Sequence, residues 1–122
     1  MLLPQFYVDD IIKTALQEDI NYLDTTTDLM IPATARSTAR FMAKAEGVVC
    51  GLEVALRVFE LLDPTFSYEI RLPEGSRVAY GDIIAELEGS TRCLLKGERT
   101  ALNLLQHMSG VATATDRCVR LV

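Results

Sequence analysis

The sequence predicts an α+β domain in which a small antiparallel β-layer is packed by helices. Apolar residues recur every three or four positions near both ends of the chain and over residues 52–62, as in amphipathic helices. Over much of residues 38–87, apolar and polar residues alternate instead, as in half-buried strands. Strands joined by short turns pair antiparallel, so the middle of the chain is predicted to form one β-layer.

Residues 8–19 are predicted to form the first helix, because their apolar residues have helical spacing and Asp9 and Asp10 suit the positive end of a helix. The apolar positions are Ile11, Ile12, Ala15 and Leu16. The helix is expected to end at residue 19. Residues 24–27, Asp-Thr-Thr-Thr, are then expected to form an irregular turn before Pro32, because such side chains bond to nearby backbone.

The middle of the chain is predicted to combine strands with one well-delimited helix. Residues 38–45 alternate as a strand, with Ala39, Phe41, Ala43 and Ala45 on one side. A helix follows over residues 52–62, with Gly51 before it and Asp63-Pro64 ending it, because proline cannot continue a helix. Further strands are predicted over residues 66–72, around Val78 and over residues 83–87, with Pro73-Glu74-Gly75 as a turn.

A long helix is predicted after Gly89, with Ser90 as its cap. Its apolar stripe contains Leu94, Leu95, Ala101, Leu102, Leu105 and Met108. Gly97 indicates close approach of another backbone, since a helical glycine costs about 1 kcal/mol relative to alanine. Ser109-Gly110 is expected to break the helix. Residues 111–122 then form a further helix without a stop signal, so we expect the chain to be cut and not finished.

Composition excludes several classes of function. The 122 residues include 17 acidic and 12 basic ones, without a basic cluster, so nucleic acid is not an expected partner. We expect no membrane segment and no secretory signal, and therefore a cytoplasmic location. Three separated cysteines fit neither a disulfide framework nor a zinc cluster, and His107 is the only histidine. No metal site is predicted.

The residues alone reveal no complete catalytic site. There is no Ser-His-Asp order, no glycine-rich phosphate loop and no pair of carboxylates that the pattern would place in one cleft. Residues 97–103 are nevertheless a candidate segment, because Arg99 is a charged residue within a strongly apolar helix. The ordinary interpretation of Arg99 is a helix arginine paired with a nearby glutamate, and a ligand contact is the alternative.

The run from Leu94 to Thr113, LLKGERTALNLLQHMSGVAT, resembles the signature of quinolinate phosphoribosyltransferases, also called nicotinate-nucleotide pyrophosphorylases (carboxylating). The resemblance extends in order over essentially the whole chain. The other matching segments are Ala15 to Asp19, Asp24 to Thr26, Glu46 to Glu53, Pro73 to Gly75 and Gly81-Asp82. Leu23 departs from the pattern, because the family commonly has glycine at this position.

This resemblance implies a mixed α/β amino-terminal domain over residues 1–110, with residues 111–122 beginning the linker helix to an α/β barrel that the chain lacks. The barrel would hold phosphoribosyl pyrophosphate and Mg²⁺, so we expect this chain alone to be inactive. The family's Thr-Arg-Lys-Thr segment has no counterpart here. No catalytic residue is therefore complete in this chain, and none of Lys13, Lys44 and Lys96 can be assigned as the catalytic lysine.

One functional residue transfers by its position in the motif. The resemblance implies that Arg99 reaches across a homodimer interface and binds a carboxylate of quinolinate in the neighbouring subunit. Glu98 is expected to order that interface without touching the substrate. The implied reaction transfers the phosphoribosyl group to quinolinate with decarboxylation, giving nicotinate mononucleotide, pyrophosphate and CO₂ in NAD biosynthesis.

Two other interpretations are compatible with parts of the sequence. A phosphoribosyltransferase-like group associated with molybdenum transport has a similar layout, and activity on quinolinate would separate it from the first interpretation. A non-catalytic module like the biotinyl or lipoyl carriers is suggested by residues 73–82. Such carriers need an exposed lysine at a hairpin tip, and this β-region contains none.

Overall fold

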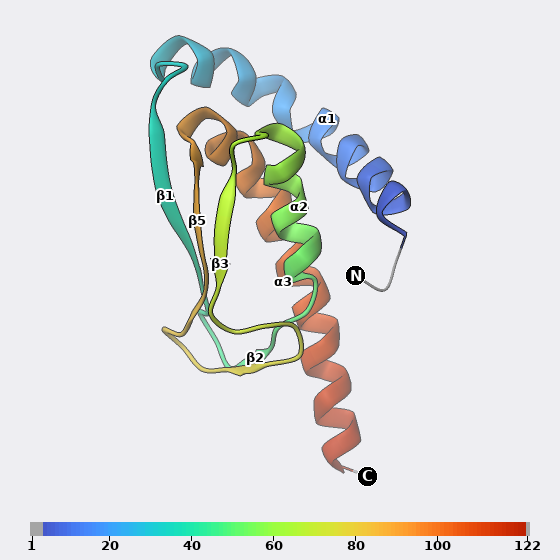
Figure 1. Ribbon diagram of the computed structural model, residues 1–122. Coiled ribbons are helices and arrows are strands. Elements are labelled where there is room, and N and C mark those ends of the chain that lie inside the picture. Colours follow the sequence, from blue (N-terminus) through green and yellow to red (C-terminus); the bar gives the residue numbers. More distant parts are fainter. Residues whose placement is uncertain (1–3, 122) are drawn as a thin grey trace.

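A computed structural model describes the backbone of residues 4–121. It also describes their side chains, except those of residues 18–29 and 119–121. The chain folds into helices and small antiparallel sheets (Figure 1), which confirms the predicted α+β class. In chain order the elements are α1 (Gln5–Met30), β1 (Arg36–Met42), β2 (Gly47–Val48), α2 (Leu52–Leu62), β3 (Ser67–Ile70), β4 (Arg77–Val78), β5 (Ile83–Ser90) and α3 (Thr91–Leu121).

A three-stranded antiparallel sheet with the order β1-β5-β3 forms one layer, and α2 and α3 cover one of its faces (Figure 1). Phe41 lies opposite Ala85, and Ala39 lies opposite Leu87. Phe41, Ala85 and Leu87 are at most 5% exposed, so this row of the sheet faces the helices. The alternation predicted for residues 38–45 is confirmed up to Ala43, whereas Ala45 is exposed.

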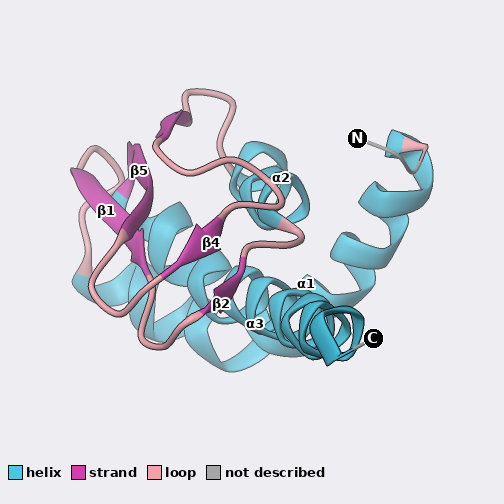
Figure 2. Cartoon of the chain, turned by 90° about the horizontal axis from the view of Figure 1, so that it is seen from below, coloured by secondary structure: helices cyan, strands magenta, loops and turns pink. Residues whose placement is uncertain are grey.

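A second sheet of two short strands, β2 and β4, lies beside α3 (Figure 2). Gly47 pairs with Val78, and Val48 pairs with Arg77. This small sheet contacts the carboxyl-terminal half of α3, while the three-stranded sheet packs on the earlier part of that helix and on α2 (Figures 1 and 2). Two separate sheets therefore contact one long helix at different positions along its axis.

Helix α2 has the bounds that the sequence predicts. Gly51 precedes it in the left-handed conformation, with φ of 83°, and Asp63 caps its carboxyl end. Gly51 has no side chain with which to cap the helix. Instead, the carboxylate of Glu74 accepts hydrogen bonds from the backbone N–H groups of Gly51 (3.1 Å), Leu52 and Glu53 (3.3 Å). An acid from the β3–β4 connection thus satisfies the free amides at the positive end of α2.

Helix α1 is longer than predicted, and the expected end at residue 19 and turn at residues 24–27 are wrong. The helical backbone runs unbroken from Gln5 to Met30 and includes position 23. Threonine and aspartate disfavour a helix by only about 0.7 kcal/mol each, and neither glycine nor proline stands between residues 5 and 31. Pro32 supplies the first strong stop, since it disfavours helical backbone at the residue before it.

An ion pair fixes α1 on α2. Asp9 lies in the second turn of α1, and its carboxylate accepts hydrogen bonds from Arg57 Nε (2.8 Å) and Nη2 (2.9 Å). This bidentate contact lowers the pKa of Asp9, with the charge of Arg57 adding to the effect against the cost of burial. The acid therefore stabilises a tertiary contact, where the sequence indicated only a role at the helix end. Val8, Ile12 and Leu16 bury the same side of α1.

Helix α3 is continuous, so the break expected at Ser109-Gly110 is wrong. Its predicted start is confirmed, because the backbone N–H of Cys93 donates to Ser90 Oγ at 3.5 Å. Leu95 was predicted to be on the apolar stripe, but it is 42% exposed. The buried stripe contains Leu94 and Ala101. Because Leu95 follows Leu94 by one residue, its side chain is turned about 100° away from that stripe and from α2.

Strand β3 alternates as predicted but buries neither face. All four of its residues are exposed, including Tyr68 (46%) and Ile70 (38%). Tyr68 lies opposite Leu87 and Ile70 opposite Ala85, so both belong to the face that the helices cover at β5. The helices leave this edge of the sheet uncovered, which alternation along one strand could not reveal.

Candidate functional site

The signature-like residues 94–113 all lie on α3. Within them, Glu98 and Arg99 are exposed, whereas Gly97, Thr100 and Ala101 are buried. The charged pair therefore occupies the outer side of a helix whose inner side packs into the domain. Arg99, the site residue predicted from the motif, is carried at the surface and not sealed in the core.

The amino-terminal end of α3 is held by hydrogen bonds to buried or half-buried groups. Asp63 Oδ2 accepts from the backbone N–H of Ser90 at 2.8 Å, while Oδ1 accepts from the backbone N–H (2.9 Å) and hydroxyl (2.6 Å) of Thr65. Burial raises the pKa of Asp63, but the hydrogen bonds from Thr65 and Ser90 and the charge of Arg36 outweigh it and leave the pKa below its ordinary value. The ionised carboxylate thus joins the end of α2 to the start of α3.

The middle of α3 approaches α2 closely at Gly97. A Cβ atom on this residue would lie 2.9 Å from Cδ1 and from Cε1 of Phe59, and 3.1 Å from Cδ1 of Leu62. The close approach predicted from Gly97 is therefore present, but the neighbouring group is a pair of side chains and not a backbone. Glycine at this position lets the core of α2 reach the backbone of α3.

The carboxyl-terminal half of α3 is fixed to the segment that contains β2. Ser109 Oγ accepts from the backbone N–H of Cys50 at 2.9 Å and donates to its carbonyl oxygen at 3.0 Å. Thr113 Oγ1 accepts from the backbone N–H of Val48 at 3.0 Å. Ser109 and Thr113 are four residues apart, a rise of about 6 Å along a helix. Two residues of extended chain span about 6.6 Å, so the spacing of the two hydroxyls suits that of their partners, Cys50 and Val48.

A groove of about 760 Å³ runs between α3 and the segment from β1 to β2. Glu98, Leu102 and Gln106 line its helix side, and Arg40 and Lys44 line the opposite side. Arg117 lines it farther along α3. The sequence pattern assigns no ligand to any of these three basic residues. The outward positions of Arg40 and Lys44 on an alternating strand were the available signal, but exposed basic residues at such positions are common.

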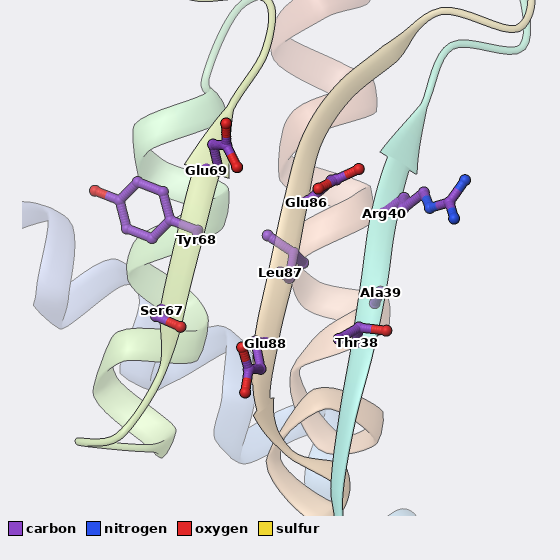
Figure 3. A pocket seen from close by; sticks show the side chains of 9 residues that line it. All are labelled: Thr38, Ala39, Arg40, Ser67, Tyr68, Glu69, Glu86, Leu87 and Glu88. Atoms are coloured by element: carbon purple, nitrogen blue, oxygen red, sulfur yellow. The ribbon is translucent and has the colours of Figure 1, made fainter.

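The outer face of the three-stranded sheet carries a second hollow, of about 380 Å³ (Figure 3). Glu69, Glu86, Glu88 and Arg40 line it. Arg71 binds Glu86 at 3.2 Å and lies 3.8 Å from Glu69, and its pKa is raised first by the hydrogen bond to Glu86. Three carboxylates around one hollow disfavour an anionic ligand, so this face is a poor site for a dicarboxylate or a pyrophosphate.

Within residues 4–121, leaving aside the side chains of residues 18–29 and 119–121, no group of three acid, histidine or cysteine side chains is placed to hold a metal ion. Nor does any helix of this part of the chain have the length and apolar composition needed to cross a membrane. His107 is exposed and lies within α3, because the helix continues past the break expected at Ser109-Gly110. Cys50 and Cys93 are half-buried free thiols, and Cys118 is an exposed one.

Comparison with known proteins defines the class. A family model described as "Quinolinate phosphoribosyl transferase, N-terminal domain" matches residues 24–109. This match, together with the fold, indicates the amino-terminal domain of a phosphoribosyl-transferring enzyme. A probable nicotinate-nucleotide pyrophosphorylase (carboxylating) of Synechocystis sp. is 37% identical over 119 residues, and one of Methanocaldococcus jannaschii is 38% identical over 117. The chain belongs to the quinolinate phosphoribosyltransferase family.

Solved structures agree with the sequence comparison. The crystal structure of NadC from Streptococcus pyogenes is similar, with a TM-score of 0.87 and 38% identity, over 93% of this chain and 40% of that one. The nicotinate-nucleotide pyrophosphorylase of Francisella tularensis gives a TM-score of 0.88 at 32% identity, over 98% of this chain and 42% of that one. The alignments with the Synechocystis and Methanocaldococcus relatives likewise cover 98% and 93% of this chain but only 40% and 39% of theirs.

Proposed function

We propose that this chain is the amino-terminal part of a quinolinate phosphoribosyltransferase and that Arg99 binds a quinolinate carboxylate in a neighbouring subunit. Family membership supports the activity. The position of Arg99 supports its role, because this exposed cation lies between buried Gly97 and buried Ala101 on a helix that hydrogen bonds hold on both sides of it. That presentation of Arg99 away from its own core is the single observation on which the site depends.

The proposed reaction joins quinolinate to the ribosyl carbon of phosphoribosyl pyrophosphate. The pyridine nitrogen forms the new bond, and pyrophosphate leaves with the electron pair of the broken carbon–oxygen bond. Loss of the 2-carboxylate as CO₂ leaves an electron pair on the ring carbon, which takes up a proton to give nicotinate mononucleotide. Activity on quinolinate also separates this function from that of the molybdenum-associated relatives.

Arg99 suits the recognition of a dicarboxylate. Its guanidinium can donate two parallel hydrogen bonds to one carboxylate and stays charged at every physiological pH. Because it would bind a group that is charged before the reaction begins, Arg99 should affect substrate affinity more than the chemical step. A helix held by buried contacts also keeps such a group in one place.

Action of Arg99 across an interface requires at least a homodimer. The proposed substrates are quinolinate and phosphoribosyl pyrophosphate, and the proposed location is the cytoplasm. Mg²⁺ would accompany phosphoribosyl pyrophosphate in the complete enzyme. The described residues of this chain do not fit a metal site, so no step is assigned to the ion here, and we expect the chain alone to show no turnover.

Replacement of Arg99 tests the proposed binding role. In the complete enzyme, Arg99→Ala should raise the KM for quinolinate about 100-fold, the equivalent of roughly 2.7 kcal/mol for a lost charge-assisted contact. The KM for phosphoribosyl pyrophosphate should change little. Arg117→Ala is a matched control, because residue 117 is exposed and lies five turns farther along the same side of α3. Unchanged quinolinate kinetics in Arg99→Ala would remove the site assignment.

Mixing of subunits tests whether Arg99 acts in the neighbouring subunit. Arg99→Ala protomers are combined in equal amounts with protomers inactivated in the barrel but intact at Arg99. If the site is shared, mixed dimers regain one complete site, and activity should return to roughly a quarter of the wild-type value. Activity that stays at the level of the separate variants would show that Arg99 serves its own subunit.

A further inference from the structure

We infer that Gly97 is a positioning residue that sets how far Arg99 stands out from the domain. This inference rests on the proposed role of Arg99 in binding quinolinate. Gly97 is buried against α2, two residues before Arg99. Two residues correspond to about 200° around a helix, so the two positions lie on nearly opposite sides of α3. A change in the spacing between α2 and α3 at Gly97 would therefore move Arg99 directly outward.

The need for glycine at position 97 comes from space and not from backbone conformation. Gly97 lies within regular helix and outside the set of glycines with positive φ, so an alanine could adopt its backbone angles. The obstacle is Phe59, whose Cδ1 and Cε1 atoms would both lie 2.9 Å from an added Cβ. Ordinary van der Waals contact begins at 3.4 Å, so alanine requires about half an ångström more room.

The ring of Phe59 cannot easily provide that room. It is 2% exposed, stacks on Phe66 with a centroid distance of 5.3 Å, and lies 6.2 Å from the ring of Phe41. Leu62 blocks the same space with its Cδ1 atom 3.1 Å from the added Cβ. Because packed rings of this kind move only together with their neighbours, the helix is the element that must shift.

The shift would be local, because α3 is anchored on both sides of Gly97. Upstream, Asp63 holds Ser90, and Thr91 shares a 2.6 Å hydroxyl hydrogen bond with Ser37. Downstream, Ser109 and Thr113 bond to the backbone of the β2 segment. Between these anchors the helix can bow away from α2, and the outer side at Arg99 moves with it. A binding group must be held to within about 0.5 Å, and a 1 Å misplacement can cost about 100-fold.

The experiment compares two glycines of the same helix in the complete enzyme. Gly97→Ala should raise the KM for quinolinate roughly tenfold by displacing Arg99, with the KM for phosphoribosyl pyrophosphate unchanged. Gly110→Ala is the matched control, because a Cβ there meets nothing within 4 Å. Its kinetics should equal those of the wild type. Quinolinate KM unchanged in Gly97→Ala, while Arg99→Ala raises it, would overturn the inference and leave the proposed function standing.

Two double variants distinguish positioning from general damage. Gly97→Ala combined with Phe59→Leu removes the ring edge and should bring the quinolinate KM back towards the wild-type value, although the core is weakened. Gly97→Ala combined with Arg99→Ala should be no worse than Arg99→Ala alone, because Gly97 acts through Arg99. Additive losses in that pair would contradict the inference.

A failure of Gly97→Ala alone to fold leaves a second test. In that case the double variant Gly97→Ala with Phe59→Leu is the test, and a quinolinate KM that stays high in it overturns the inference. If Arg99→Ala itself has no effect, the proposed function fails first.

Discussion

The two halves of α3 differ in what holds them. Between Leu94 and Leu105, buried residues recur at helical spacing, and the helix packs on α2 and the large sheet mainly through apolar contacts. Beyond Leu105, the described residues are half-buried or exposed, and the contacts to the β2 segment include the hydroxyls of Ser109 and Thr113. Apolar packing depends on volume and sets the distance between elements, whereas hydrogen bonds are directional and set the register of the helix along the strand.

The largest expected effect lies in the apolar half. Phe59→Ala should lower the free energy of unfolding by about 3–5 kcal/mol, because it opens a cavity where Phe59 meets Phe66 and Gly97. Urea unfolding of the chain measures the change. Tyr80→Ala is the control, because Tyr80 is 75% exposed and should alter stability by less than about 0.5 kcal/mol. A loss below about 1 kcal/mol for Phe59→Ala would mean that apolar packing does not dominate this half.

An intermediate effect is expected at Asp63, where α3 begins. Asp63→Asn should cost about 1–2 kcal/mol at pH 7, since an amide cannot accept all the hydrogen bonds from Thr65 and Ser90. The pKa of Asp63 is lowered in the folded state. Its contribution is therefore complete above the unfolded pKa of about 3.9 and is lost as pH falls through the folded pKa.

Urea unfolding at a series of pH values measures this dependence on Asp63. The difference between the wild type and Asp63→Asn should shrink as the pH falls below about 4. Glu88→Gln is the control, because Glu88 is an exposed acid of strand β5, and the difference in stability between this variant and the wild type should stay small throughout. A constant difference for Asp63→Asn down to the lowest pH would show that ionisation of Asp63 does not stabilise the junction.

The smallest effect is expected in the hydrogen-bonded half. Thr113→Val keeps the shape of the side chain but leaves the backbone N–H of Val48 without its partner, which should cost about 1 kcal/mol. Hydrogen exchange at the Val48 amide should accelerate. Thr115→Val is the control, because Thr115 is exposed and its hydroxyl bonds to Val111 of the same helix. Equal exchange rates at Val48 in both variants would show that Thr113 does not fix the register.

Sequence patterns predicted the elements whose limits are encoded locally. Helix α2 was predicted residue for residue, because Gly51 and Asp63-Pro64 mark its ends. Helix α1 is longer than predicted, because residues 24–27 have only a weak preference against helix. Neither glycine nor proline stands there to end the helix. The break predicted in α3 failed because Ser109 finds its partner at Cys50, 59 residues away along the chain.

The candidate site shows the same limit. Residue pattern alone left Arg99 open between a surface pair and a ligand contact, and only the longer motif favoured the ligand. The pattern did indicate close approach at Gly97, but it could not name Phe59, because the facing residue is fixed by how α2 and α3 pack. The groove beside β1 and α3 went unnoticed for a related reason, since its lining comes from segments far apart in sequence.

The carboxylate of Glu74 at the start of α2 has a consequence for how the protein emerges from the ribosome. Leu52 is translated 22 residues before Glu74, which at ordinary rates of synthesis is roughly 1–4 s earlier. During that interval the first turn of α2 must leave its amides to water, and isolated helices of this length are marginal. We therefore expect this helix to become stable on the nascent chain only after the β3–β4 connection has been translated.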